Sequence, residues 1–337
     1  MINVKSLKDG EVVEGLLALR SKDGKDEGLR SYRDKPGQFF VIRVGNSNGD
    51  ITLKYWGGKP SEKIEQLFSS IEAGDVVFVK GRCTHDSYSK ELVISVNEEP
   101  KYGAPTEFLK KADEGEYRPE DFMPSLPDEA VEALFTELKG FVEGVKNPHL
   151  KSLLMRFFAD AGFVKAFKRS PAARKNHHNY VGGLLEHSVN VARLCSLINE
   201  FYPMDRDLLI TGALLHDIGK TREYTVKASV DVTSEGMFIG HLSMTAEMIR
   251  KEIEALDGFP QTLAHKVIHM ILSHHGELEF GSPKEPAFPE ALALFHADYM
   301  DASVKNTIQE IEGAPEDAAW IYSKSLKRFL HTGIKKP

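Results

Sequence analysis

The residues best suited to chemistry are histidines and aspartates, and 12 of the 13 histidines lie beyond residue 148. Several occupy positions where helical spacing places them on an apolar face. In GGLLEHSVNVARLCSLI, for example, His187 shares a face with Val191, Leu194 and Ile198. A histidine or aspartate likewise lies on the apolar face of four other segments, LLITGALLHDIGK, HLSMTAEMI, HKVIHMILSHHG and EALALFHADYMDA. The positions predicted to point inward are His187, His216, His241, His274 and Asp298.

Inward-facing carboxylates and imidazoles need partners, because burying them unpaired is costly. A lone inward histidine is usually a hydrogen-bonded core residue, but five such sites on successive helices need one another. A shared metal ion would satisfy all of them together. Imidazole and carboxylate suit divalent Mn, Fe, Co, Ni or Zn, and the lack of cysteine ligands argues against a structural zinc site. A metal with open coordination positions acidifies water, which predicts hydrolytic chemistry.

The first part of the chain carries the pattern of short strands. EVVEGLLAL, QFFVIRV, DITLKYW, DVVFVKGR and ELVISV are rich in Val, Ile and aromatic residues and are separated by turn signals. SEKIEQLFSSI, between the third and fourth strands, has helical spacing. Five short strands with a helix between the third and fourth is the order of an OB-fold, a small Greek-key barrel that often binds oligonucleotides.

The strand pattern ends in GAPTEFLKKADEGEYRPEDFMPSLP, which has four prolines and many charges and is typical of a linker. Beyond Pro127 the apolar residues recur every three or four positions nearly to the end, which predicts helices. We therefore expect a multi-domain chain. An all-β OB-fold barrel that binds nucleic acid would occupy residues 1–104, the linker 105–127, and an all-α helical bundle 128–337.

Composition and charge are those of a globular protein of 337 residues with a net charge of −7. Residues 1–104 are neutral, with 16 basic and 16 acidic side chains, so the negative charge lies in the helical part. That balance argues against non-specific binding of nucleic acid, although two divalent ions would add about four positive charges. Only Cys83 and Cys195 are present, and neither a signal peptide nor an apolar run of membrane length is evident. A cytoplasmic protein is expected.

The inward residues resemble the signature of a known superfamily. His187, the adjacent pair His216–Asp217 and Asp298 match the H…HD…D pattern of the HD phosphohydrolases, and HDIGK at 216–220 is the most specific stretch. The resemblance implies that these four residues hold one metal ion.

Other histidines match members of the superfamily that carry two metals. These are His241 and the pair His274–His275. The resemblance implies that Asp217 bridges two ions, with His241 and one or both of His274 and His275 on the second.

A narrower resemblance covers nearly the whole chain. NPHLKSLL, PAARKNHHNYVGGLLEHS, LLHDIGKTREY and SHHGELEFGSP together resemble the YhaM family. Its members pair an N-terminal OB-fold with a C-terminal HD domain and are 3′–5′ exoribonucleases that favour manganese. The resemblance implies hydrolysis of single-stranded RNA, and of single-stranded DNA as a second substrate, to 5′-nucleoside monophosphates. The implied cofactor is a pair of divalent ions, with Mn²⁺ as first choice.

Further polar residues are predicted to act on the substrate. Lys220 follows Asp217 by three residues and is expected to hold the oxygens of the scissile phosphate, as a second catalytic residue beside Asp217. A basic loop before the first ligand helix is expected at the substrate entrance. In the barrel, an aromatic ring and a neighbouring cation are expected to contact a base and a phosphate. The expected substrate-binding residues are Arg174, Lys175, His177, His178, Trp56 and Lys54.

Two other functions fit the same residues. One is a hydrolase of small nucleotides or cyclic dinucleotides that uses the same metal site, which the dependence of cleavage on substrate length would separate from an exonuclease. The other is a nucleic-acid or nucleotide binding protein whose HD site is only structural. The intact set of ligand-type residues argues against the second.

Overall fold

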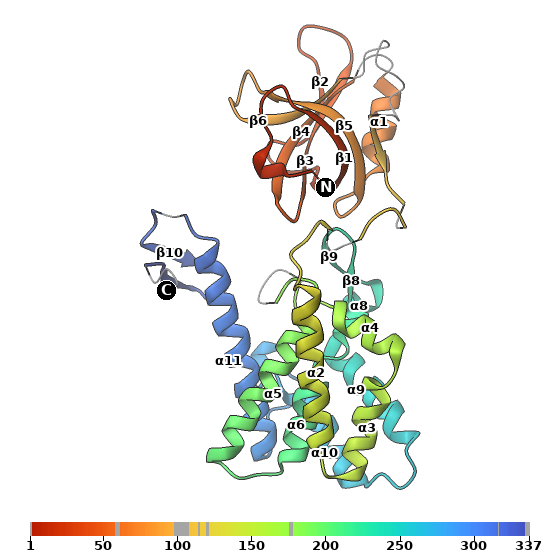
Figure 1. Cartoon of the computed structure of the whole chain (residues 1–337), viewed down its shortest axis with the longest axis vertical. Helices are drawn as coiled ribbons and strands as arrows, with labels where there is room; N and C mark the ends of the chain where they lie inside the picture. Colours follow the sequence, from red (N-terminus) through yellow and green to blue (C-terminus); the bar gives the residue numbers. More distant parts are fainter. Residues whose placement is uncertain are drawn as a thin grey trace. The chain divides into compact units, whose positions relative to one another are not determined.

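The computed structural model describes residues 2–57, 61–97, 108–113, 115–118, 121–174, 178–315 and 317–333. The chain divides into two compact units. The first comprises Met1–Pro124 together with Val226–Asp231, and the second comprises Ser125–Thr225 together with Val232–Pro337 (Figure 1).

The first unit is a closed β-barrel. Its sheet order is β1-β3-β4-β6-β5, and β5 pairs again with β1 to close it. Neighbours are antiparallel except β4 and β6, which run parallel. The helix α1 lies between β4 and β5, so the predicted OB-type order is confirmed. The elements are β1 (Val12–Ser21), β2 (Gly28–Ser31), β3 (Gln38–Asn46), β4 (Gly49–Trp56), α1 (Ser61–Ser70), β5 (Val76–His85) and β6 (Leu92–Asn97), preceded by a 3₁₀ turn at Val4–Ser6.

Two strands extend the barrel beyond the five that were expected. The short β2 pairs with β3. β7 (Leu109–Lys111) pairs with β5 and lies inside the stretch expected to be a linker. The reason is apolar burial, because Leu109 is fully enclosed in the barrel core. The linker expected at 105–127 is therefore partly a strand of the first unit, and its residues 105–107, 114, 119 and 120 lie outside the described part.

Alternation along β3 and β4 separates the core from the outer face of the barrel. Phe40 and Tyr55 are fully buried and stack on each other, with ring centroids 4.8 Å apart. Their neighbours Phe39 and Trp56 point to the opposite face, as strand geometry requires, and are half-buried. The sheet therefore places one aromatic pair in the core and another on the outside.

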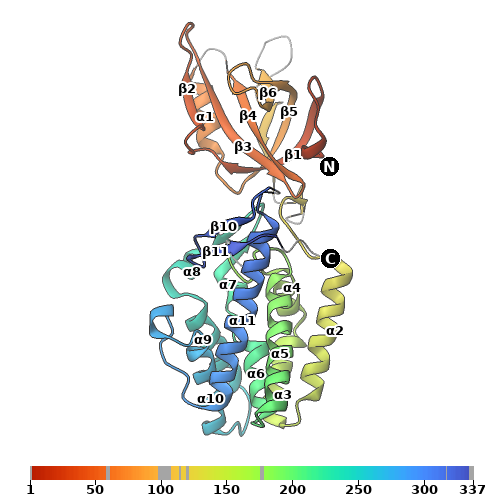
Figure 2. The same cartoon turned by 90° about the vertical axis from the view of Figure 1, so that its left-hand side faces the viewer.

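The second unit is a helical bundle (Figure 2). In its central helix α6, every residue from Leu208 to Leu215 is buried, which is expected of a helix enclosed by others. The region expected to be purely helical also holds two short β-hairpins. The helices are α2 (Asp128–Gly144), α3 (Pro148–Phe158), α4 (Ala161–Arg169), α5 (Gly183–Phe201), α6 (Arg206–Leu215), α7 (Lys220–Glu223), α8 (Ser234–Ile239), α9 (His241–Glu254), α10 (Gln261–Ser273) and α11 (Pro289–Glu312). The hairpins pair β8 (Tyr224–Val226) with β9 (Val230–Val232) and β10 (Trp320–Ser323) with β11 (Arg328–His331).

Side-chain caps fix where several helices begin. The Asn147 carboxamide oxygen accepts hydrogen bonds from the backbone N–H groups of His149 and Leu150 at the start of α3. Asp160 and Asp205 cap α4 and α6 in the same way. Among the described residues, no helix is long and apolar enough to cross a membrane.

Candidate metal centre

The predicted ligand residues converge from five places in the second unit. His187 lies on α5, His216–Asp217 directly follow α6, and His241 is the first residue of α9. The pair His274–His275 follows α10, and Asp298 lies on α11. His187, His216, Asp217 and His274 are buried, whereas His241, His275 and Asp298 are partly accessible.

One group of donor atoms gathers around one oxygen of Asp217. Its Oδ2 lies 3.4 Å from Nε2 of His187 and 3.2 Å from Nε2 of His216. Asp298 completes this group, because its Oδ1 lies 3.1 Å from the same nitrogen of His187. The four residues are those expected to hold the first metal ion.

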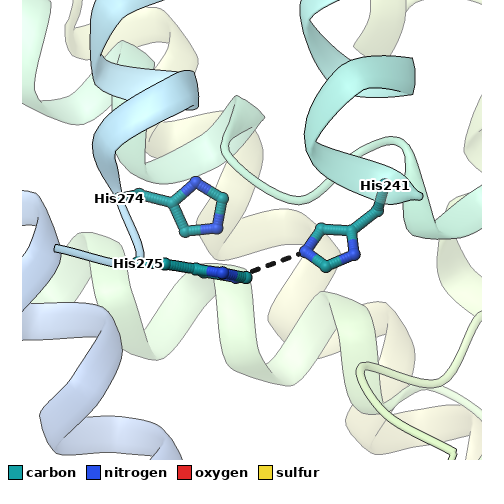
Figure 3. Close-up of side chains that lie close together, drawn as sticks. All are labelled: His241, His274 and His275. Carbon is teal, nitrogen blue, oxygen red and sulfur yellow. Dashed lines mark hydrogen bonds between the residues drawn. The ribbon is translucent and has the colours of Figure 1, made fainter. Parts of the chain in front are cut away.

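A second group faces the other oxygen of Asp217. Its Oδ1 lies 3.6 Å from Nε2 of His241 and 3.5 Å from Nε2 of His274. Figure 3 shows His275 beside them, and its Nε2 lies 3.4 Å from Nε2 of His241. These three imidazoles form a cluster with metal-ligand spacing. The carboxylate of Asp217 thus lies between the two groups, with one oxygen toward each.

In each of the five histidines, Nδ1 faces an acceptor. His216, His274 and His275 donate to the backbone carbonyls of Ala213, Ile271 and Phe280. His187 donates to Oδ2 of Asp301, and Nδ1 of His241 lies 3.0 Å from Oε2 of Glu223. Because these oxygens can only accept, a neutral ring carries its proton on Nδ1. In this neutral form every Nε2 presents a lone pair to the centre, the form in which histidine binds metals.

The donor atoms fit a divalent cation. Among the described residues, Oδ1 of Asp217 and Nε2 of His274 are buried and have no hydrogen-bond partner, which is costly unless another group satisfies them. Nε2 of His187 and Nε2 of His216 lie 3.1 Å apart. Two nitrogens bound at about 2.1 Å to one metal, at a right angle, are about 3 Å apart. A cation would therefore satisfy atoms that the protein leaves unpaired.

The electrostatics of the centre also favour a cation. Burial by itself would raise the pKa of Asp217, but the Lys220 ammonium and the His216 imidazole hold that pKa well below its ordinary value. Burial likewise opposes ionisation of Asp298, and its hydrogen bond with His187 keeps the pKa low. Burial lowers the pKa of His275 to about 4, which keeps this imidazole neutral. Burial by itself would lower the pKa of His187, but the carboxylates around this ring raise it well above its ordinary value, so a metal ion would take the place of a proton there. Ionised carboxylates beside imidazoles form a cation-binding set.

Carboxylates behind the ligands hold the imidazoles in place. Oδ2 of Asp301 accepts from His187 at 2.7 Å and also lies 2.8 Å from Nε2 of His178. On the other side of that ring, Nδ1 of His178 lies 3.0 Å from Oε2 of Glu186. Asp301 and Glu223 were not predicted from the sequence. Asp301 follows Asp298 by three residues on one helix, a spacing that places both on the same face and could have revealed it.

His178 differs from its expected role. It was expected to line the substrate entrance, but it is fully buried and both ring nitrogens have protein partners. Because no atom of this imidazole reaches solvent, it cannot contact a phosphate at the entrance. It lies behind His187 instead and holds Asp301.

Of the other substrate contacts expected in the second unit, the structure describes Lys220 and Arg174. The Lys220 ammonium is buried at the centre, 2.6 Å from Oδ2 of Asp217. Arg174 is exposed. Lys175 and His177 lie outside the described residues.

Gly219 explains why the HDIGK stretch can lie so close to α9. A Cβ on this residue would lie 2.5 Å from the carbonyl oxygen of His241, so only glycine allows this approach. The backbone N–H of Gly219 donates to Oγ1 of Thr245, which fixes the contact. The glycine therefore brings Asp217 and His241 to the same centre.

The outer face of the barrel carries a stack of three rings. Phe39 lies between Tyr32 and Trp56, with centroid distances of 5.1 and 5.0 Å. The Trp56 indole donates to Oγ of Ser95, which fixes that ring. The ammonium of Lys54 lies 2.7 Å from Oδ1 of Asp86, and this lysine is largely buried. Because its charge is already paired with a carboxylate, the structure does not support the phosphate contact expected of Lys54.

The HD domain family matches residues 184–303, a range that contains all of the converging histidines and aspartates. The second unit is therefore an HD domain, the class of helical domain that carries metal-dependent phosphohydrolase sites.

Proteins of similar sequence identify the family within this class. The 3′-5′ exoribonuclease YhaM of Shouchella clausii is 31% identical over 309 residues, which cover 90% of this chain and 87% of that protein. The YhaM protein of Bacillus velezensis is 32% identical over 300 residues, covering 88% and 86%. That of Bacillus subtilis is 31% identical over 309 residues, covering 90% and 88%. The chain belongs to the YhaM family.

Proposed function

We propose that this protein is a metal-dependent 3′–5′ exoribonuclease that shortens single-stranded RNA, and single-stranded DNA as a second substrate. The proposal depends most on one observation, the position of Asp217. Its two carboxylate oxygens face two separate groups of imidazoles, in a chain of the YhaM family. Relatives named 3′-5′ exoribonuclease support the direction of attack and the RNA substrate.

Two ions would share Asp217. The first would be held by His187, His216, Asp217 and Asp298. The second would be held by Asp217, His241, His274 and His275. Nitrogen and carboxylate donors without cysteine suit manganese, with iron, cobalt, nickel and zinc as alternatives. When bound, such ions acidify water and offset the charge that develops on a phosphate.

The protein's own residues would orient the substrate. Asp301, Glu223 and the backbone carbonyls fix the five imidazoles, so little reorganisation is needed when a phosphodiester binds. Lys220 would stabilise negative charge on the non-bridging phosphate oxygens, since its ammonium already lies at the carboxylate of Asp217. Arg174 would contact the incoming strand, and Lys175 and His177 remain predictions for the same entrance.

The barrel would hold the upstream strand. Bases stack on exposed aromatic faces with little dependence on sequence, and Tyr32, Phe39 and Trp56 form a continuous stack on β3, β4 and the segment before them. OB-folds bind oligonucleotides on the corresponding face. A barrel attached to the hydrolytic domain would raise the local concentration of RNA at the centre.

Attack at the 3′ end fixes the products. A water oxygen adds to the phosphorus of the terminal linkage, and the bond from that phosphorus to the 3′ oxygen of the preceding nucleotide breaks. That 3′ oxygen takes up a proton. The released product is a 5′-nucleoside monophosphate, and the shortened strand keeps a 3′-hydroxyl.

A time course on a 5′-labelled single-stranded RNA with Mn²⁺ tests the proposal. We expect a ladder that shortens by one nucleotide per step, while a blunt duplex resists because only a single strand can enter a helical pocket. Immediate short internal fragments, or equal cleavage of a circular RNA, would show an endonuclease and contradict the directional claim.

A further inference from the structure

Two exposed aromatic side chains, Phe280 and Tyr299, lie close together in the HD domain. Their exposed fractions are 56% and 49%. The ring centroids are 6.4 Å apart and the ring planes differ by only 10°. Large apolar rings are usually withdrawn from water, so an exposed, nearly parallel pair indicates a surface suited to a flat ligand.

Both rings belong to segments that carry ligand residues. Tyr299 directly follows Asp298 on α11. The backbone carbonyl of Phe280 accepts the hydrogen bond from Nδ1 of His275, at 3.2 Å. The ring pair therefore lies on the two segments that supply Asp298 and His275 to the metal centre.

The packing around this segment holds the rings in a fixed arrangement. Gly276 has a φ of +79°, and a Cβ there would lie 2.3 Å from the Phe295 ring. Only glycine therefore lets the segment that leads to Phe280 lie against Phe295. The Phe295 ring in turn packs on Tyr299, with centroids 6.1 Å apart, one helical turn away. Phe295 thus packs against both the Tyr299 ring and the segment that leads to Phe280.

We propose that Phe280 and Tyr299 form a subsite for the base of the 3′-terminal nucleotide. This inference rests on the proposed exonuclease function, because the ligand is the nucleotide whose phosphate occupies the metal centre. Stacking suits this task, since every base has a π-face and the enzyme must accept each nucleotide in turn. The metal centre would bind the phosphate, and the two rings would orient the departing nucleotide.

Two RNAs that differ only at the 3′-terminal nucleotide test the subsite, one with an ordinary base and one abasic. The quantity measured is kcat/KM for release of the first nucleotide. Stacking of a base on one aromatic ring contributes to binding, so Phe280→Ala and Tyr299→Ala should each lower kcat/KM on the complete RNA about five- to a hundredfold. Neither variant should differ from wild type on the abasic RNA. Phe280→Trp should keep the activity on the complete RNA.

Matched controls separate base binding from structure. Phe329→Ala removes an even more exposed ring on β11, at 68% exposure, and should leave both rates unchanged. Phe280→Ala keeps the carbonyl that holds His275, so its bound metal should equal that of wild type. Equal losses on both RNAs, or no loss on the complete RNA, would overturn the subsite. A wild-type protein that shortens neither RNA would overturn the proposed function and the subsite with it.

Discussion

Nδ1 of His187 donates a hydrogen bond to Oδ2 of Asp301 at 2.7 Å, and the same oxygen lies 2.8 Å from Nε2 of the buried His178. The carboxylate of Asp301 thus holds the His187 imidazole on the side away from the centre, and the His178 imidazole holds this carboxylate in turn. Such a contact sets the tautomer of His187 and directs its Nε2 toward Asp217 and Asp298. The metal centre therefore extends beyond the residues that would touch an ion.

Asp301→Ala should weaken metal binding without removing a ligand. Removing the hydrogen-bond partner of a metal-bound histidine typically lowers metal affinity about 10- to 100-fold. We therefore expect the Mn²⁺ affinity of this variant, measured by calorimetric titration, to fall by a factor in that range. Asp257→Ala, which removes an exposed carboxylate between α9 and α10, serves as the control and should bind as wild type. Unchanged Mn²⁺ affinity in Asp301→Ala would show that His187 is oriented without this carboxylate.

The outer face of the barrel should contribute to the affinity for long RNA. Phe39→Ala and Trp56→Ala each remove a ring from the stack, and each should weaken binding of a long single strand by about 1–3 kcal/mol. Hydrolysis of a small phosphodiester should be unaffected, because the ligand residues all lie in the HD domain. Tyr88→Ala removes a ring that is 95% exposed and outside this stack, and is the matched control. Binding measured by fluorescence anisotropy that is equal for all four proteins would show that this face is not the RNA-binding surface.

The buried ion pair between Lys54 and Asp86 should make the barrel's stability depend on pH. Burial by itself would raise the pKa of Asp86, but the Lys54 ammonium and the backbone N–H of Ser89 lower it to about 2. A folded-state pKa below the ordinary 3.8 means that the ionised carboxylate stabilises the fold above pH 4. That stabilisation is lost as the pH falls from about 4 to 2.

Asp86→Asn should therefore lower the free energy of unfolding by about 2 kcal/mol at pH 7. The difference from wild type should shrink between pH 4 and pH 2. Urea unfolding followed through Trp56 fluorescence, in a Trp320→Phe background, measures it. A difference that stays constant over this range would mean that the cost of the substitution is not electrostatic.

The convergence of these histidines and aspartates was predictable because each of them carries a local signal. Helical spacing places His187, His274 and Asp298 on apolar faces, and a buried histidine or aspartate needs a partner wherever the fold brings it. The adjacent pair His216–Asp217 contributes two donors from one helix end. The strands of the barrel could also be predicted from the sequence, since each strand alternates between core and surface residues.

Other features depend on contacts between distant parts of the chain. His178 is held by Asp301, more than a hundred residues later, so its burial has no local signal. β7 has only three residues and becomes a strand because Leu109 completes the barrel core. The two hairpins in the region expected to be helical are similarly short, with strands of three or four residues. The sequence alone could not exclude Lys54 as a phosphate contact. Its partner Asp86 lies 32 residues later, directly after β5, and only the fold brings the two side chains together.

The central claim is that hydrolysis requires metal ions shared through Asp217. The most direct measurement is a titration of metal-depleted protein with Mn²⁺, in which the rate of RNA hydrolysis and the bound metal are followed together. The activity of the wild-type protein should return as about two equivalents bind. Asp217→Ala should bind neither ion tightly and stay inactive, whereas His296→Ala, which removes an exposed imidazole two residues before Asp298, should behave as wild type. Full hydrolysis in excess chelator, or full activity of Asp217→Ala, would contradict the account.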